Sequence, residues 1–200
     1  MSALPVSFYN RPVITVAREL IGTRLVRRLE NQRAGGYIIE TEAYQGESDL
    51  ACHARAGRTP RTEVMYGPAG NAYVYFIYGM HWMLNAVAEA EGVPCAVLIR
   101  AILPVEGIAL IASRRSPARR SDWTSGPARV CQALEIDGRL NGASLCDPRG
   151  SLVIEPGAAI PDEHILCGPR VGIDRVPEPW RSQPWRFRAS PQAVQSLPDE

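Results

Sequence analysis

Hydrophobic residues recur at helical spacing near the start of the chain and at strand spacing through much of the rest. Val13, Val16, Ala17 and Leu20 form one apolar stripe, which predicts a helix over Pro12–Ile21 with proline in its first turn. Shorter apolar runs predict the remaining elements. The expected strands are Thr23–Leu29, Pro94–Leu103, Ser151–Ile154 and Trp185–Arg188, and the expected helices are Pro104–Arg115 and Pro127–Leu134, with Ser125 as N-cap of the second. The segments with loop composition are Ser116–Thr124 and the tail after Arg188.

The segment Tyr37–Tyr44 reads Tyr-Ile-Ile-Glu-Thr-Glu-Ala-Tyr and is predicted to form a strand. Alternate residues of a strand point to the same side, so we expect Ile38, Glu40, Glu42 and Tyr44 to share one face. Two carboxylates would then lie close together on that face.

A polar segment, Gln45–Gly70, follows this strand. Its content of glycine, proline, arginine and serine predicts a long surface excursion, of the kind that often carries function. It contains His53, Arg55, Arg58 and Arg61.

The run Asn71–Val87 is dense in β-branched and aromatic residues and is interrupted by Gly79. This pattern predicts two strands joined by a tight turn, with Tyr78 at the tip of the hairpin. Tyr73 and Tyr75 share a face of the incoming strand. The outgoing strand presents His81, Met83 and Asn85 on one face.

Strands in sequence-adjacent hairpins, with helices outside them, predict an α+β fold. We expect a curved, mostly antiparallel β-sheet flanked by helices, with a protruding β-hairpin. The 200 residues suit a single domain, 1–200, with its core over about residues 10–190. No apolar run approaches the roughly 18 residues of a membrane span, and residues 1–11 lack the layout of a signal peptide. We expect a cytoplasmic protein that does not contact membranes.

Composition narrows the chemistry further. The five cysteines are odd in number, widely spaced and never in a Cys-x-x-Cys pair, and the three histidines are scattered, so neither a disulfide framework nor a metal site is predicted. The formal net charge of +1 does not by itself indicate or exclude a nucleic-acid partner. All 22 basic residues are arginine, so no lysine amine can form a Schiff base with a sugar.

Glu40 and Glu42 are the first candidates for chemistry. Two neighbouring carboxylates perturb each other, and a desolvated one has a raised pKa suited to a general base. The alternative is that both are solvated or paired with arginine on an exposed face. Arg100, within the apolar stretch Val97–Ala101, is costly to bury unless a carboxylate meets it, which makes it a candidate partner for either acid. The alternative for Arg100 is an exposed sheet edge.

An aromatic cluster accompanies the arginine-rich loops. It consists of Tyr44, Tyr73, Tyr75, Phe76, Tyr78 and Trp82. Such residues suit stacking against nucleobases, and they are equally typical of an ordinary β-sheet core. His53, taken alone, is typical of a surface histidine or of one whose hydrogen bonds are satisfied within the fold.

Seven short motifs connect these candidates. They are Glu40-Thr41-Glu42-Ala43-Tyr44, Ala51-Cys52-His53, Tyr73–Met80, Asn85, Val97–Ala101, Ser125-Gly126-Pro127 and Pro169-Arg170-Val171-Gly172. In this order and approximate spacing, over about residues 10–190, the chain resembles the alkyladenine (3-methyladenine) DNA glycosylase family.

The resemblance implies a monofunctional glycosylase of base excision repair that uses no cofactor. It implies a monomer that binds double-stranded DNA, flips a damaged purine out of the duplex and hydrolyses its N-glycosidic bond to leave an abasic site. The substrates implied are 3-methyladenine, 7-methylguanine, hypoxanthine and ethenoadenine.

The resemblance also implies a role for individual residues. Glu42 corresponds to the general base that activates water, and Arg100 and Val171 correspond to residues that hold this water. Tyr44, His53 and Tyr75 correspond to the walls of the flipped-base pocket. Asn85 corresponds to the residue that contacts the purine edge, and Tyr78 and Met80 correspond to the residues inserted into DNA. Glu40 receives no catalytic role and is interpreted as structural.

Two other functions are compatible with the same residues. A nucleoside or sugar hydrolase would use the same chemistry on a free metabolite, without dependence on duplex DNA. A non-catalytic nucleic-acid-binding module would use the arginines and aromatic residues alone, and would leave no abasic sites.

Overall fold

The strand β2 (Gln32–Gln45) is the central strand of the fold, because it pairs with three others. The computed structural model describes residues 2–198, and its strands form one sheet with the order β3-β4-β5-β2-β1-β6. Strand β8 pairs with β2 and with β7, and every pairing is antiparallel. The other strands are β1 (Arg24–Leu29), β3 (Ala72–Ile77), β4 (His81–Ala88), β5 (Cys95–Glu106), β6 (Leu152–Glu155), β7 (Ile165–Gly168) and β8 (Arg186–Ala189).

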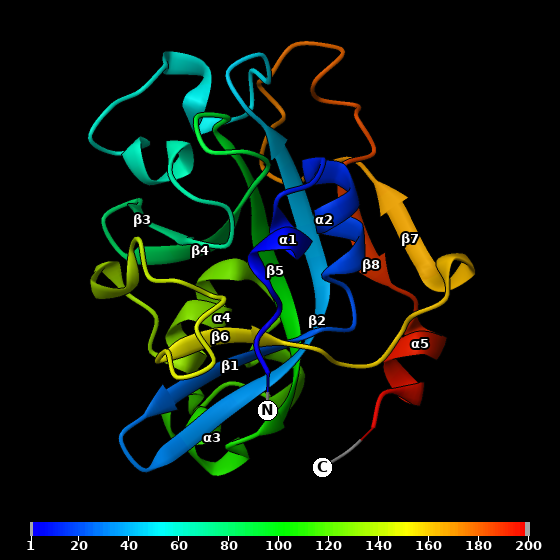
Figure 1. The fold of residues 1–200 in the computed structure, drawn as a ribbon. Helices are drawn as coiled ribbons and strands as arrows, with labels where there is room; N and C mark the ends of the chain where they lie inside the picture. The colour runs from blue at the N-terminus through cyan, green and yellow to red at the C-terminus, as the bar shows by residue number, and fades with distance from the viewer. Residues whose placement is uncertain (1, 199–200) are drawn as a thin grey trace.

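Short helices surround this sheet. The α-helices are α1 (Val6–Tyr9), α2 (Val13–Glu19), α3 (Ile108–Arg115), α4 (Pro127–Leu134) and α5 (Pro191–Ser196), and the 3-10 helices are η1 (His53–Ala56), η2 (Glu63–Tyr66), η3 (Arg120–Asp122), η4 (Gly138–Leu140) and η5 (Asp162–His164). In Figure 1, α2 lies against the central strands β2 and β5, and the β3–β4 hairpin projects to one side. The hydroxyl of Thr41 donates to the carbonyl of Ala17 (2.7 Å), which ties β2 to α2. The mixed α+β fold predicted from the sequence is confirmed.

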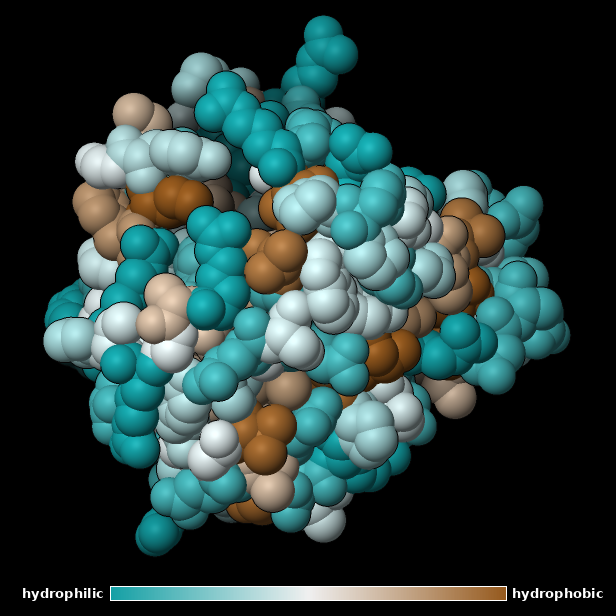
Figure 2. Space-filling view, turned by 90° about the horizontal axis from the view of Figure 1, so that it is seen from above, coloured by the Kyte–Doolittle hydropathy of each residue, from teal (hydrophilic) through white to brown (hydrophobic). Residues whose placement is uncertain are grey.

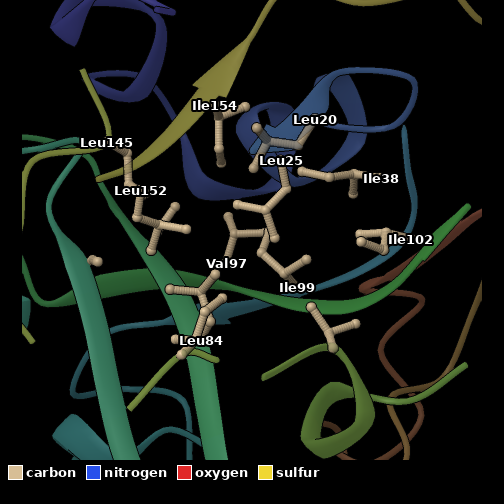
Figure 3. Packing of buried hydrophobic residues seen from close by; sticks show 14 of the residues in the cluster. Leu20, Leu25, Ile38, Leu84, Val97, Ile99, Ile102, Leu145, Leu152 and Ile154 are labelled. Atoms are coloured by element: carbon tan, nitrogen blue, oxygen red, sulfur yellow. The ribbon is translucent and has the colours of Figure 1, made fainter. Parts of the chain in front are cut away.

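The main core joins one face of α2 to the sheet. Leu20, the residue that follows α2, packs with Leu25 of β1, Ile38 of β2 and Ile99 of β5, all of them fully buried (Figure 3). Burying an aliphatic side chain of this size stabilises the fold by about 1.5–3 kcal/mol. This core covers one face of the central strands and leaves their other face to the residues of the cavity described below.

Several predicted elements are confirmed with small changes at their ends. The first helix covers Val13–Glu19, inside the predicted range, and the helix Pro127–Leu134 has the predicted bounds. The run 71–87 forms the expected hairpin of β3 and β4, with Tyr78 in the turn. No helix among residues 2–198 has the length and apolar character needed to cross a membrane.

The prediction of a helix from Pro104 is wrong, because β5 continues to Glu106 and α3 begins at Ile108. Pro104 lies opposite Gly36 at an irregularity in the β2–β5 register, where the missing N–H of proline is tolerated. Gly36 is needed there, since a Cβ would lie 2.0 Å from the carbonyl oxygen of Leu103. Tertiary pairing therefore overrides the usual preference of proline for a helix start.

The predicted shared face of Ile38 with the two glutamates is also wrong. A bulge between Ile38 and Glu40 shifts the register, so Ile38 joins the core beside Leu20 while Glu40 and Glu42 contact Arg100. An extra residue in one strand reverses the alternation of side chains on either side of it.

Two expectations about helix ends and loops fail for local reasons. Ser125 is not the N-cap of α4: Gly126 occupies that position, while Ser125 forms a bridge with Ala101 and accepts a hydrogen bond from Arg129 (2.8 Å). As far as residue 198, where the described part of the chain ends, the tail after Arg188 is not a loose loop; residues 199–200 lie outside the described part. The tail continues β8 and then forms α5, whose N-cap Ser190 accepts from the N–H of Ala193.

Candidate active site

A cavity of about 220 Å³ opens on the side of the sheet away from Ile38 and Leu20. The strands β2, β3, β4 and β5, the excursion 45–70 and the segment 171–173 all contribute to its walls. The lining residues are Tyr44, Ala51, Cys52, His53, Met65, Tyr73, Tyr75, Ile77, Tyr78, Met83, Asn85, Ala96, Leu98, Arg100, Pro127, Val171, Gly172 and Ile173. Segments far apart in the sequence therefore meet at one hollow.

Glu42 lies directly behind this cavity, and its side chain is 0% exposed. One carboxylate oxygen, Oε1, accepts the backbone N–H of Val171 (2.7 Å), and the other, Oε2, accepts the hydroxyl of Tyr44 (2.9 Å). Both donors belong to residues that line the cavity. A buried carboxylate is thus held in one orientation by partners that face the hollow.

Arg100 supplies positive charge to both glutamates, as the sequence suggested. Its Nη1 lies 3.3 Å from Oε2 of Glu42, and its Nε lies 2.9 Å from Oε1 of Glu40, which also pairs with Arg186 (2.6 Å). Burial raises the pKa of Glu42 above its ordinary value, although Arg100 and the hydrogen bonds from Val171 and Tyr44 act against the rise. Glu42 is therefore an ionisable base poised closer to neutral pH than a solvated glutamate.

Aromatic residues with polar atoms at their ring edges form the walls of the cavity. The His53 and Tyr75 rings meet edge to face, with centroids 4.5 Å apart, and Nδ1 of His53 lies 3.0 Å from the hydroxyl of Tyr73. Burial lowers the pKa of His53 to about 4, with a further lowering from Arg61 and Arg55. The histidine is consequently neutral at physiological pH, and it acts as a hydrogen-bonding wall.

Asn85 contributes an amide on the β4 wall. It is buried, and its Nδ2 donates to the carbonyl of Tyr73 across the hairpin (3.1 Å). The side-chain amide is thereby fixed, with Leu98 of β5 next to it in register. A fixed amide beside a flat aromatic pocket can discriminate between hydrogen-bonding edges of a ligand.

The hairpin tip lies at the mouth of the cavity. Tyr78 is 80% exposed, and it lines both the cavity and an adjoining depression of about 730 Å³ that also holds Arg55, Arg61 and Arg175. Figure 2 views the molecule from above, the end that carries the excursion and the 168–185 segment in Figure 1, and shows a mostly hydrophilic surface with small separate hydrophobic patches. Exposed aromatic and cationic groups therefore surround the entrance.

Most residues singled out from the sequence come together here. The cavity brings together Tyr44, His53, Tyr75, Asn85, Arg100 and Val171, with Glu42 behind them and Tyr78 at the rim. Met80, which is 67% exposed, is separate from it and borders another depression with His81 and Trp82. Within residues 2–198, no group of three or more histidine, cysteine or acidic side chains could hold a metal ion, and the five cysteines are free.

The sequence reasoning missed a buried ion pair beside the site. Asp49 and Arg170 are both 0% exposed and in contact, and the Arg170 guanidinium lies 4.8 Å from the centroid of the Tyr44 ring. It also missed that Arg61 lies over Tyr75, 5.1 Å from its centroid. Asp49 and Arg170 are 121 residues apart in the sequence, so no local pattern could have indicated that they pair.

Comparison with known proteins agrees with this site. The Methylpurine-DNA glycosylase (MPG) family matches residues 7–193, so the chain belongs to the methylpurine-DNA glycosylase family. A Myxococcus xanthus protein named "Putative 3-methyladenine DNA glycosylase" is 50% identical over 187 residues, which cover 94% of this chain and 90% of the relative. Proteins of the same name from Methanocella arvoryzae (48% identity; 94% and 92% covered) and Bacillus licheniformis (46%; 92% and 91%) are also similar. The chain is a DNA glycosylase, a hydrolase of N-glycosyl bonds that acts on DNA.

Proposed function

We propose that this glycosylase removes alkylated or deaminated purines from double-stranded DNA by hydrolysis with a water activated by Glu42. The purines in question are 3-methyladenine, 7-methylguanine, hypoxanthine and ethenoadenine. The observation that carries the proposal is the buried Glu42 carboxylate, which has a raised pKa and is held by Tyr44 and Val171 at the wall of an aromatic cavity. The single domain acts as a monomer.

Access to the sugar requires that the base leaves the helix. A stacked nucleotide shields its C1′ atom, so the damaged nucleotide is rotated into the cavity at a cost of a few kcal/mol. Tyr78 at the exposed hairpin tip fills the space that the base vacates, and Met80 in the same turn contacts the duplex beside it. A mismatched or damaged base costs less to extrude, which favours lesions over normal purines.

The chemical step breaks the bond between C1′ and the purine nitrogen. A water oxygen forms a bond to C1′, one water proton passes to the Glu42 carboxylate, and the electron pair of the broken bond leaves with the purine. Developing positive charge on the sugar is stabilised by the same carboxylate, as in inverting glycosidases. In the structure Arg100 and the Val171 N–H contact Glu42 itself, which supports a role for both in orienting this carboxylate toward the water that it activates.

The pocket favours purines that are already good leaving groups. A base methylated at N3 or N7 carries positive charge, and the electron-rich rings of Tyr44 and Tyr75 attract it through cation–π contacts. His53 is neutral at pH 7, so it does not repel such a base. The fixed Asn85 amide contacts the purine edge and separates lesions by their hydrogen bonds.

A set of duplex oligonucleotides, each with one defined lesion, tests the function. The protein is incubated with each duplex, and heating in alkali then reveals abasic sites. We expect strand breaks at several purine lesions with the wild type, and a rate lower by about 10²–10⁴ with Glu42→Gln, which keeps the shape but removes the proton acceptor. Lesion-duplex binding should survive in that variant.

The controls separate the two alternative functions. Free damaged nucleosides are supplied under the same conditions, and turnover of these without duplex DNA would identify a nucleoside hydrolase. Binding to the lesion duplexes without any abasic product would identify a non-catalytic binding module. If Glu42→Gln excises at the wild-type rate, Glu42 is not the base and Glu40→Gln becomes the variant to examine.

A further inference from the structure

One buried arginine connects the chain segments that surround the carboxylate of Glu42. Arg170 forms a two-pronged ion pair with Asp49, with Nη2–Oδ1 and Nη1–Oδ2 distances of 2.9 and 2.5 Å. The Asp49 carboxylate also accepts the backbone N–H groups of Gln45 (3.1 Å) and Ala51 (2.9 Å). This ion pair therefore joins the start of the excursion 45–70 to the segment that contains Val171.

The same guanidinium reaches the strand that carries Glu42. Its Nη1 donates to the carbonyl of Ala43 (3.0 Å), the residue between Glu42 and Tyr44, and its Nη2 donates to the carbonyl of Trp180 (3.2 Å). Its Cζ atom lies over the rings of Tyr44 and Trp185, 4.8 Å and 5.0 Å from their centroids. The next residue in the chain, Val171, donates its N–H to Glu42.

We propose that Arg170, held by Asp49, is a positioning residue for hydrolysis: it fixes the Tyr44 hydroxyl and the Val171 N–H, which together orient the Glu42 carboxylate. The proposal rests on the proposed function, because it assumes that Glu42 activates the water. The four side-chain hydrogen bonds of Arg170 within the described residues go to Asp49, Ala43 and Trp180, so it acts on Glu42 through its neighbours.

Physical chemistry favours positioning over simple stabilisation. A buried ion pair gains little or nothing over well-packed hydrophobic residues of similar volume, because both charges lose their hydration. A planar guanidinium that binds a carboxylate with two prongs and stacks on two rings has one allowed orientation. Such a group is suited to hold atoms within the small tolerance that catalysis requires.

The test is the pH dependence of single-turnover excision from a lesion duplex by Arg170→Lys and Asp49→Asn. Lysine keeps the charge but lacks the fork and the flat face. The hydrogen bonds from Tyr44 and Val171 stabilise the ionised form of Glu42, so misplacing them raises its pKa further. We expect the rate near neutral pH to fall at least about tenfold. The acid limb, which is the fall of the rate as the pH is lowered, should move to higher pH, and the affinity for the lesion duplex should change little.

Other charged and titratable groups face Glu42 and are unchanged in these variants. They are Glu40, Tyr44, Tyr75, Arg100 and Arg186. In Arg170→Lys, which keeps the charge, a shift of the acid limb to higher pH therefore reports the altered hydrogen bonds. Asp49→Asn removes a negative charge beside Arg170 and by itself would move the limb to lower pH, so a shift to higher pH in this variant reports the altered hydrogen bonds against that charge effect. In a Glu42→Gln background, Arg170→Lys should cause no further loss of excision.

Controls distinguish positioning from a loss of folding stability. Ile154→Val and Ile154→Ala weaken the core at β6, away from the cavity. Of these two control variants, we compare with the Arg170 variant the one whose melting temperature is nearest to it. We expect this control to keep the wild-type acid limb at temperatures well below melting. If both ion-pair variants fail to fold, Trp185→Leu, which removes one stacking face and leaves the ion pair, is measured in the same way.

The possible results separate the two proposals. A wild-type rate and acid limb in a folded Arg170, Asp49 or Trp185 variant would overturn the positioning role. The role would also be overturned if the variants lose rate without a shift of the acid limb and the Ile154 control loses as much. Wild-type excision by Glu42→Gln would instead overturn the assignment of the base. That measurement is made first and does not depend on Arg170.

Discussion

Glu42 is a carboxylate with one hydrogen-bond donor on each oxygen and no contact with solvent. Without Val171, Tyr44 and Arg100, burial would favour its protonated form more strongly, because these three partners act against the rise of its pKa. Without burial, its pKa would stay low and it would accept a proton poorly. In this site, desolvation raises the pKa of Glu42, and a few directed hydrogen-bond donors and Arg100 act against the rise.

At the scale of this residue, we predict that excision falls as the pH is lowered through the raised pKa of Glu42. Only the ionised carboxylate accepts a proton from water, so the rate is full above this pKa and decreases below it. Single-turnover rates measured over a series of pH values give the acid limb directly. Its midpoint should lie above the ordinary pKa of glutamate.

A second variant assigns this limb. The pKa of His53 is about 4, so the histidine stays neutral over the working range, and His53→Gln should keep the limb in place. A limb that persists in the residual activity of Glu42→Gln would show that another group titrates.

At the scale of elements, the β3–β4 hairpin serves two purposes. Its strands place Tyr75 and Asn85 on the cavity wall, and its turn presents Tyr78 to solvent. Tyr78 has a φ of 54°, in the left-handed region that a tyrosine rarely adopts. An exposed aromatic residue on a strained turn contributes little to the stability of the fold, which is consistent with a role in DNA contact.

We predict that Tyr78→Ser weakens capture of the flipped base and leaves the melting temperature unchanged. Stacking of one aromatic ring on a base contributes about 1–3 kcal/mol, so the flipping equilibrium should fall about fivefold or more. Fluorescence of an ethenoadenine lesion reports the flipped population.

The matched control for this hairpin is Phe76→Ser, which removes an exposed aromatic residue from the same element. Phe76 packs against Trp82, with centroids 4.7 Å apart, and does not line the cavity. An equal loss of flipping in both variants, or none in Tyr78→Ser, would contradict the role of the tip.

At the scale of the whole molecule, the chain contains 22 arginines and no lysine. Strand cleavage by a glycosylase requires an amine that attacks C1′ and then eliminates the phosphate. We therefore predict that the products are intact strands with an abasic site, and that breaks appear only after alkali or an abasic endonuclease. Borohydride added during the reaction should trap no covalent complex of protein and DNA.

The control for this trapping is a lysine-dependent glycosylase on its own lesion under the same conditions. A trapped adduct with the present protein would exclude water as the sole nucleophile. It would direct the search to an amine at the start of the chain.

Local sequence determined much of the fold because its signals act over short distances. Apolar spacing gave the helix α2, and the aromatic run broken by Gly79 gave the β3–β4 hairpin with Tyr78 at its tip. The order of short motifs identified the family, and the absence of lysine excluded a Schiff base with a side-chain amine, since neither conclusion depends on coordinates.

Tertiary structure decided the burial of Glu42 and the hydrogen bonds that hold its carboxylate. The bulge after Ile38 separated that residue from the acidic face, and the pairing of β2 with β5 kept Pro104 in a strand. The contacts of Val171 with Glu42 and of Arg170 with Asp49 join segments more than 120 residues apart. Such pairings, and the burial that raises the pKa of Glu42, depend on how the packed chain excludes water, which no local sequence pattern encodes.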